Sequence, residues 1–234
     1  KEHTFAMIKP DAYLNIGRII QHIYDAGFKI NKIKMSRFDE ETAGIFYEEH
    51  KGKHFYQGLV EFVTSDVCVG MEVVGENVIK GWRELLGPTN TERAREEAPN
   101  SIRAQYGTDG TRNACHGSDS PASAKRELEI FFGNKSPIPP TSIQNNCTCG
   151  VIKPHIVKLG ASGEIIQMIL DEGFEISAME MFTLDKPTAE EFLEVYKGVL
   201  PEFQSIIEEI TTGPCIVMEI RQEDIVEAFR KLCG

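Results

Sequence analysis

An internal repeat constrains this chain more than any other feature of its sequence. Ile8-Lys9-Pro10 returns as Ile152-Lys153-Pro154, 144 residues later. Gly17–Asp39 then matches Gly163–Asp185 at a spacing of 146, with 11 identities in 23 positions. A period as long as a whole domain indicates a duplicated domain and excludes a solenoid of short units.

Chain length and proline content divide the sequence between the two copies. The 234 residues are enough for two domains of roughly 100–150 residues each. The segment between the copies carries three prolines among polar residues, which is typical of a semi-rigid linker. We therefore predict a first domain over residues 1–133, a linker over 134–146 and a second domain over 147–234.

The second copy is shorter than the first within this sequence. Gly234 corresponds to Gly87 of the first copy, so the repeat predicts roughly 45 further residues for a complete second unit. We expect the second domain to lack its C-terminal part, and the sequence alone leaves the reason open.

Hydrophobic periodicity predicts the fold class. Apolar residues alternate in the expected strands and recur at helical spacing in the expected helices. The expected strands are 4–8, 28–35 and 67–73, and the expected helices are 17–26, 40–49, 78–86 and 123–132. A Gly-, Pro- and Asn-rich stretch over 87–112 is expected to be a long loop. This order predicts α+β architecture: two tandem ferredoxin-like (split βαβ) domains, each with helices on one face of an antiparallel sheet.

The charge and composition of the chain exclude several classes of binding partner and site. Thirty-six acidic and 25 basic side chains give a net charge of -11, which disfavours nucleic acid and anionic membranes as general partners. No apolar run approaches the 18 residues of a membrane span. Six cysteines are too few for a disulfide scaffold, and neither they nor the histidines have the spacing of a metal site. We expect a cytoplasmic protein without a metal centre in the protein itself.

A histidine in a tight polar segment is the first candidate for chemistry. Asn113–Ser120 reads Asn-Ala-Cys-His-Gly-Ser-Asp-Ser, and its small neighbours leave His116 poorly placed for core packing. One interpretation is a histidine that stabilises a turn or is merely exposed. The other is a nucleophilic imidazole whose tautomer is fixed by Glu127 on the next expected helix.

The sequence has no nucleotide-binding glycine loop. Neither Gly-x-x-x-x-Gly-Lys-Ser/Thr nor Gly-x-Gly-x-x-Gly occurs, so any bound phosphates would be neutralised by dispersed side chains. Lys9, Arg83 and Arg103 are the candidates. Each of them, taken alone, is also consistent with a solvated surface charge.

Taken together, Lys9-Pro10-Asp11 and Asn113–Ser120 resemble the nucleoside diphosphate kinase family, and the likeness extends through both copies. The resemblance implies γ-phosphoryl transfer between nucleoside tri- and diphosphates by a ping-pong mechanism, with His116 as the phosphorylated nucleophile. It also implies Mg²⁺, bound mainly through the nucleotide phosphates. The tandem arrangement is similar to a two-domain member of the family found with ciliary axonemes.

The same resemblance assigns roles to the other site residues. Lys9 and Tyr47 would flank the nucleophile, and Glu127 would orient it. The nucleotide would be bound by Lys9, Phe55, Leu59, Arg83, Thr89, Arg103, Asn113 and Ser118. Among these, Phe55 would stack on the base, Asn113 would contact the sugar, and the two arginines and Thr89 would hold phosphates.

Two functions from different classes are therefore open. One is a nucleoside diphosphate kinase. The other, implied by the tandem resemblance, is a structural component of ciliary doublet microtubules with a secondary or idle kinase site, a cytoskeletal location and tubulin or microtubule-associated partners. In either case we predict a monomer whose two units pair internally as a pseudo-dimer.

The two copies are predicted to be unequal. Asp11, Tyr47 and Phe55 of the first copy are replaced by His155, Leu193 and Glu202. Arg83 aligns with Arg230, whereas the remaining site residues beyond it have no counterpart. His155 is a conceivable substitute nucleophile, but no orienting carboxylate lies near it in sequence, and activated nucleophiles need such a partner. We therefore expect all phosphoryl transfer to depend on the first copy.

Overall fold

Seven strands and twelve α-helices make up the computed structural model, which describes residues 1–234. The strands are β1 (Glu2–Ile8), β2 (Lys29–Ser36), β3 (Cys68–Gly75), β4 (Cys115–Gly117), β5 (Cys147–Ile152), β6 (Glu175–Phe182) and β7 (Cys215–Arg221). The helices are α1 (Ile16–Asp25), α2 (Glu40–Phe46), α3 (Tyr56–Val63), α4 (Val78–Leu86), α5 (Thr91–Glu97), α6 (Ile102–Tyr106), α7 (Pro121–Phe132), α8 (Pro154–Leu159), α9 (Ser162–Asp171), α10 (Lys186–Phe192), α11 (Phe203–Ile210) and α12 (Ile225–Cys233). None of the helices is long and apolar enough to span a membrane.

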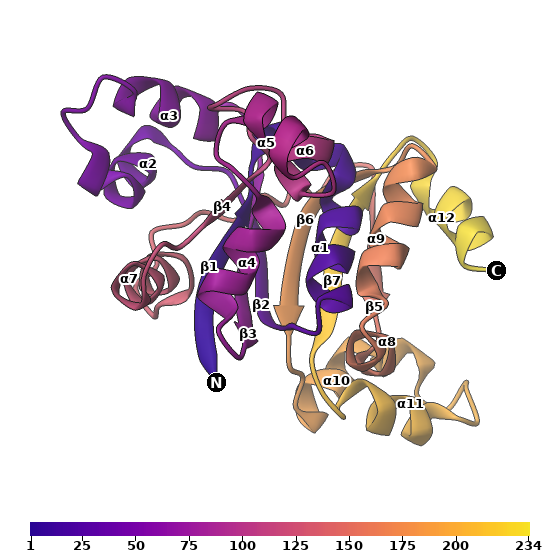
Figure 1. The fold of residues 1–234 in the computed structure, drawn as a ribbon. Coiled ribbons are helices and arrows are strands. Elements are labelled where there is room, and N and C mark those ends of the chain that lie inside the picture. Colours follow the sequence, from indigo (N-terminus) through magenta and orange to yellow (C-terminus); the bar gives the residue numbers. More distant parts are fainter.

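The strands form one continuous antiparallel sheet in the order β4-β1-β3-β2-β6-β7-β5 (Figure 1). By the sequence repeat, β1, β2 and β3 correspond to β5, β6 and β7. The order within one copy is therefore the reverse of the order within the other, and the equivalent strands β2 and β6 meet at the centre. Their ladder is short, with Lys34 opposite Glu180. The sequence prediction of tandem α+β, ferredoxin-like units is confirmed.

Helices cover both faces of the sheet in the first copy. Side chains alternate along a strand, and in β1 Ala6 and Ile8 join the core beneath α1 and α4. Phe5 and Met7 join a second core that includes Phe131 of α7. The expectation that helices pack on one face only is therefore wrong. The strand is buried from both sides, which explains why its apolar run does not alternate with polar residues.

Three helices of the first copy were not predicted from the sequence. Helix α3 was not expected, and α5 and α6 lie in the stretch expected to be a loop. Both short helices begin at N-caps, where the side chains of Asn90 and Ser101 accept hydrogen bonds from Arg93 N and Ala104 N. A capping side chain satisfies backbone donors at the first turn, so these helices form in a segment whose composition favours turns.

The two copies pack through equivalent helices. Helices α1 and α9 lie side by side (Figure 1). The contact is so close that a Cβ on Gly17 would lie 2.3 Å from Gln167 N, and one on Gly163 would lie 2.6 Å from Gln21 N. The side chain of Gln21 donates to Gly160 O, and that of Gln167 donates to Leu14 O, each at 2.8 Å. These paired hydrogen bonds obey the 146-residue repeat, so the interface is pseudo-symmetric.

The segment between α7 and β5 is held against the sheet by a few contacts, although most of its residues are exposed or half-buried. Ile138 is buried, and its carbonyl accepts a hydrogen bond from Lys34 Nζ at 3.1 Å. Further along, the Glu219 carboxylate accepts from the backbone N–H groups of Ile143 and Gln144, at 2.7 and 2.9 Å. The connection contains no helix or strand, and these bonds fix its path from β2 to β7.

Candidate active site

A cavity of about 660 Å³ in the first copy gathers the predicted site residues. Its walls come from α2, α3, α4, α6, β4, α7 and the loops between them. Ten of the eleven predicted residues line it: Lys9, Tyr47, Phe55, Leu59, Arg83, Thr89, Arg103, Asn113, His116 and Glu127. The eleventh, Ser118, is fully buried behind the cavity wall. Residues as far apart in sequence as Lys9 and Glu127 are thus brought to one place.

His116 is held by a short chain of hydrogen bonds. It lies on β4, and its Nε2 is 2.9 Å from Oε2 of Glu127 on α7. The same carboxylate oxygen accepts a hydrogen bond from Ser118 Oγ at 2.7 Å. Ser118 Oγ in turn accepts from the N–H of Phe5 at 3.2 Å. The Glu127 side chain is only 6% exposed, whereas His116 retains 22%.

This chain of contacts determines which imidazole nitrogen is available. A neutral histidine carries one N–H, and a carboxylate can only accept, so Glu127 selects the tautomer protonated on Nε2. Nδ1 has no hydrogen-bond partner in the protein and keeps its lone pair. The rings of Phe5 and Phe46 lie 6.1 and 5.3 Å from the imidazole and restrict its rotation. An imidazole held in this way is suited to act as a nucleophile.

The three cations predicted for this site, Lys9, Arg83 and Arg103, line the cavity with different degrees of burial. Arg83 is exposed, whereas Lys9 is buried. The Arg103 guanidinium donates to Gly87 O and Cys115 O, at 3.0 and 3.1 Å, and its buried Nε has no partner. Burial, and to a smaller extent the charge of Arg103, lower the pKa of Lys9 to about 8. Together they give this part of the acidic chain a local positive field suited to a small anion.

Asn113 links the cavity wall to Lys9. Its Oδ1 accepts from Lys9 Nζ at 2.8 Å, while Nδ2 donates to Thr89 O and Gly110 O at 3.0 and 3.2 Å. Asn113 is buried. The amide therefore fixes the lysine and the loop at Thr89, and it retains one oxygen lone pair toward a ligand.

The opposite wall is aromatic and apolar. Tyr47 is 5% exposed, and burial raises the pKa of its hydroxyl well above the ordinary value. Phe55 stands at the mouth, 41% exposed, with Lys53 Nζ 5.7 Å from its ring centroid and the His50 ring 5.6 Å away. Leu59 lies one turn further along α3. An exposed aromatic ring beside an apolar residue can accept the flat face of a base.

Sequence reasoning missed two residues that shape this site. The guanidinium of Arg126 donates to Ile45 O and Phe46 O, at 3.4 and 3.2 Å, and so ties α7 to α2. Nothing in the sequence distinguishes Arg126 from a surface arginine. Asp11 binds the backbone N–H of Ala114 through Oδ2 at 3.0 Å, and its place in the Lys-Pro-Asp motif was the available signal.

The second copy presents a different surface at the equivalent positions. Leu193 follows α10 as Tyr47 follows α2, and Glu202 precedes α11 as Phe55 precedes α3. His155 Nδ1 lies 2.7 Å from Glu209 Oε1. The inference that His155 lacks an orienting carboxylate is thus wrong, because α11 supplies one from 54 residues away. The pair is open to solvent, with the two side chains 54% and 35% exposed, and Lys153, whose charge acts on Glu209, is itself exposed.

The chain resembles known proteins along its whole length. A family model described as nucleoside diphosphate kinase matches residues 2–136 and 146–234. Nucleoside diphosphate kinase homolog 7 of Rattus norvegicus is 45% identical over 236 residues, which cover 100% of this chain and 60% of the rat protein. The chain thus spans about 60% of the length of its rat and mouse relatives.

Single-domain relatives match the first copy. The nucleoside diphosphate kinase of Aquifex aeolicus is 47% identical over 133 residues, covering 56% of this chain and 94% of the relative. Its crystal structure aligns with a TM-score of 0.56, over 57% of this chain and 96% of that one. The Halobacterium salinarum enzyme, solved in complex with CDP, is 35% identical with a TM-score of 0.53, over 61% of this chain and 94% of that one.

Proposed function

The chain belongs to the nucleoside diphosphate kinase family, and on that premise we propose that it transfers the γ-phosphoryl group of a nucleoside triphosphate to a nucleoside diphosphate through phosphorylated His116. The observation that carries the proposal is the Ser118–Glu127–His116 chain of hydrogen bonds at the wall of the cavity. It leaves Nδ1 as the nucleophilic atom.

The reaction proceeds in two displacements at one site. The Nδ1 lone pair attacks the γ-phosphorus, the bond to the β–γ bridging oxygen breaks, and the nucleoside diphosphate leaves. A β-phosphate oxygen of a second nucleoside diphosphate then attacks the phosphorus, and the bond to Nδ1 breaks. Phosphorylation gives the ring imidazolium character, and the charge of the Glu127 carboxylate stabilises it. The proton stays on Nε2, and the carboxylate accepts the hydrogen bond from it. Catalysis otherwise consists of alignment and charge neutralisation.

The cavity residues divide the work of binding. Lys9, Arg83 and Arg103 neutralise phosphate oxygens with Thr89, Asn113 binds the sugar, and Phe55 with Leu59 receives the base. Stacking uses the face of the base, which all bases share, so specificity for the base is broad. We further propose domain boundaries at residues 133 and 147, with the whole site in the first domain.

The substrate is the Mg²⁺–nucleotide complex. No group of three His, Cys, Asp or Glu side chains in the chain could hold a metal ion by itself. That composition fits Mg²⁺, which retains water and binds through phosphates with few protein ligands. The ion would neutralise phosphate charge alongside Lys9 and Arg103.

A direct assay tests the proposal. Purified chain is mixed with Mg²⁺–ATP and a second nucleoside diphosphate, and the new triphosphate is quantified. We expect transfer with parallel initial-rate lines, the kinetic mark of a ping-pong mechanism. Absence of any transfer would rule out the kinase for this chain.

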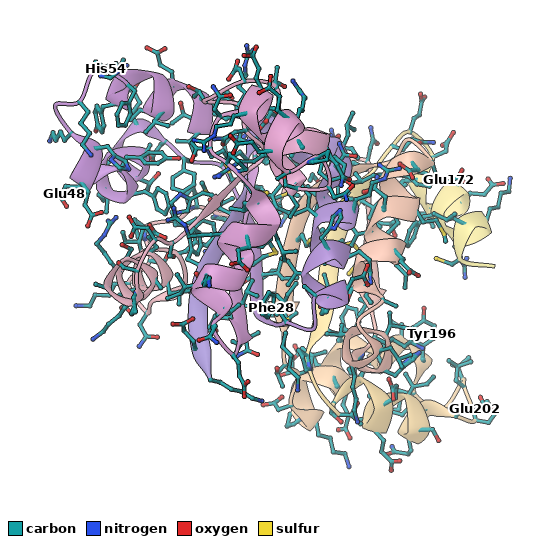
Figure 2. The ribbon with its side chains drawn as sticks, viewed as in Figure 1. Phe28, Glu48, His54, Glu172, Tyr196 and Glu202 are labelled. Atoms are coloured by element: carbon teal, nitrogen blue, oxygen red, sulfur yellow. The ribbon has the colours of Figure 1, made fainter.

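We propose a structural role in ciliary doublet microtubules, with tubulin as partner, as the alternative. The observation that favours it lies in the second copy: Val195 and Val199 are 76% and 70% exposed where the first copy carries Glu49 and Lys53. With Tyr196 and Leu200, which are also exposed, they form a run of apolar side chains at the surface, and a contiguous exposed apolar patch marks a protein contact. These residues lie in a tip of the second copy that spans residues 194–202. Figure 2 shows the tip, labelled at Tyr196 and Glu202, at the opposite end of the molecule from Glu48 and His54.

Co-sedimentation with polymerised tubulin tests this alternative. The wild-type chain should pellet with microtubules, and the V195E/V199K variant, which restores the residues of the first copy, should pellet less. Equal pelleting of the two proteins would exclude the tip as the contact. Such a role would place the protein on the cytoskeleton of the cilium.

A further inference from the structure

Ala114, two residues before His116, has a backbone conformation that L-residues rarely adopt. Its φ is 70°, and the N–H of Cys115 donates to Asn113 O at 2.9 Å across it. A hydrogen bond between residues two apart around a positive φ defines a γ-turn of the strained kind. Ala114 is fully buried. Such strain persists only where the surroundings enforce it, and it concentrates at functional sites.

The Lys9–Asp11 segment forms hydrogen bonds with both the N–H and the carbonyl of Ala114. The backbone N–H of Lys9 donates to Ala114 O at 2.8 Å, continuing the β1–β4 ladder by one residue beyond Ile8 and Cys115. The Asp11 carboxylate accepts from the N–H of Ala114 through Oδ2 at 3.0 Å. Both peptide groups of the strained residue are therefore tied to the same short segment.

The carboxylate of Asp11 is kept in place at a cost. Its Oδ1 is buried without a hydrogen-bond partner, and burial raises the pKa of the group. A half-buried carboxylate with an unpaired oxygen is unfavourable unless its other contacts compensate. The contact with Ala114 is the one that Asp11 makes to the nucleophile strand.

We propose that Asp11 is a positioning residue that holds Ala114 in the left-handed turn and thereby sets the start of β4, so that His116 meets Glu127 and lines the cavity. The second copy has His155 at this position, and that side chain binds Glu209 instead. The inference rests on the proposed function, because its catalytic consequence is the rate of His116 phosphorylation.

Four variants distinguish a positional role from an electrostatic one. Asp11→Ala removes the acceptor, and Asp11→Asn keeps an oxygen that can accept from Ala114 while removing the charge. Ala114→Gly supplies a residue that adopts positive φ without strain, and the double variant D11A/A114G combines the two changes. Glu219→Gln is the matched control, since Glu219 also accepts from backbone N–H groups but lies far from the cavity in the second copy.

The readout is the single-turnover rate of His116 phosphorylation by saturating Mg²⁺–ATP, together with the Kd for ADP. D11A should slow phosphorylation by about 10- to 100-fold, the usual effect of a displaced catalytic group. The Kd should change little. D11N should retain most of the rate, A114G in the D11A background should restore it at least partly, and E219Q should match the wild type. A D11N rate as low as that of D11A, with no rescue by glycine, would overturn the proposal.

Hydrogen exchange at the Ala114 amide separates this proposal from the proposed function. If the wild-type chain transfers no phosphoryl group, the kinase assignment fails, but the clamp, by which we mean the hydrogen bond from the Ala114 N–H to Asp11, can still be measured. D11A should then accelerate exchange of the Ala114 amide by at least about tenfold relative to D11N and E219Q, because a buried hydrogen bond is lost. Equal exchange in D11A and D11N would overturn the clamp even if both proteins are active.

Discussion

Phe55 is a partly exposed aromatic side chain at the cavity, where we propose that it stacks on the base. The ring is 41% exposed at the cavity mouth and lies in edge contact with His50 and His54. Replacement by alanine should weaken nucleotide binding by about 1–3 kcal/mol, the usual size of one base–aromatic contact. The loss should be nearly equal for ADP and GDP, because the ring contacts a face and no edge. Titration calorimetry checks this, and a loss confined to one base would refute stacking.

Lys9 should give nucleotide binding a distinct pH dependence. Burial lowers its pKa to about 8 in the free chain, so above pH 8 the side chain is mostly neutral. Bound phosphates favour the charged form, so the pKa rises on binding and a proton is taken up. At pH 8.5 calorimetry in two buffers of different ionisation enthalpy should register uptake of about half a proton or more. Lys9→Gln should abolish it, and uptake that persists in Lys9→Gln would assign the proton elsewhere.

At the scale of elements, the α1–α9 contact depends on the absence of side chains at two glycines. A Cβ on Gly17 would lie 2.3 Å from Gln167 N and 2.4 Å from Gly163 O, so Gly17→Ala must push the helices apart. We expect a loss of about 1–3 kcal/mol in the free energy of unfolding, typical of overpacking. Gly58 inside α3 has nothing within 4 Å of its Cβ position. Gly58→Ala is therefore the control and should be neutral or stabilising, since alanine favours helix. Equal denaturation midpoints would contradict the packing described.

Sequence periodicity predicted the elements that carry their own signal. The repeat and the apolar pattern located β1, β2, β3, α1 and α4 to within a few residues. The pattern failed where capping chemistry or tertiary contact decides. Helix α3 is held by burial of Val60 and Val63, and α5 by the Asn90 cap. Neither tertiary burial nor capping can be recognised from the local spacing of apolar residues.

The candidate site was likewise predictable only in part from the sequence. The residues of the Lys-Pro-Asp and Asn113–Ser120 segments could be named in advance because they stand in dense motifs. Contacts between segments that are distant in sequence could not be predicted. The Asp11–Ala114 hydrogen bond spans 103 residues and the His155–Glu209 pair spans 54, and one sequence holds no record of which distant side chains meet.

At the scale of the whole molecule, each copy covers the other's pairing face. The β2–β6 junction and the α1–α9 interface lie within one chain, so neither of these two surfaces is free to pair with another chain. The net charge of -11 also disfavours self-association. We predict that the isolated chain sediments at the mass of one chain at micromolar concentration. A dimeric or hexameric mass would contradict this.

The histidines of the two copies lie in very different surroundings. His116 lies in a cavity with a buried lysine, Lys9, and an almost fully buried carboxylate, whereas His155 and Glu209 form a solvent-exposed pair. Both histidines have a carboxylate neighbour, so the environment and not the pairing alone should decide which one reacts.

The most direct measurement is to incubate the wild-type chain, His116→Gln and His155→Gln with γ-labelled Mg²⁺–ATP and to map acid-labile, alkali-stable phosphate to a residue. We expect stoichiometric label on His116 in the wild type, nearly the same label in His155→Gln, and none in His116→Gln. On addition of a nucleoside diphosphate, the label should leave as a triphosphate. Label on His155, or transfer by purified His116→Gln, would contradict this expectation.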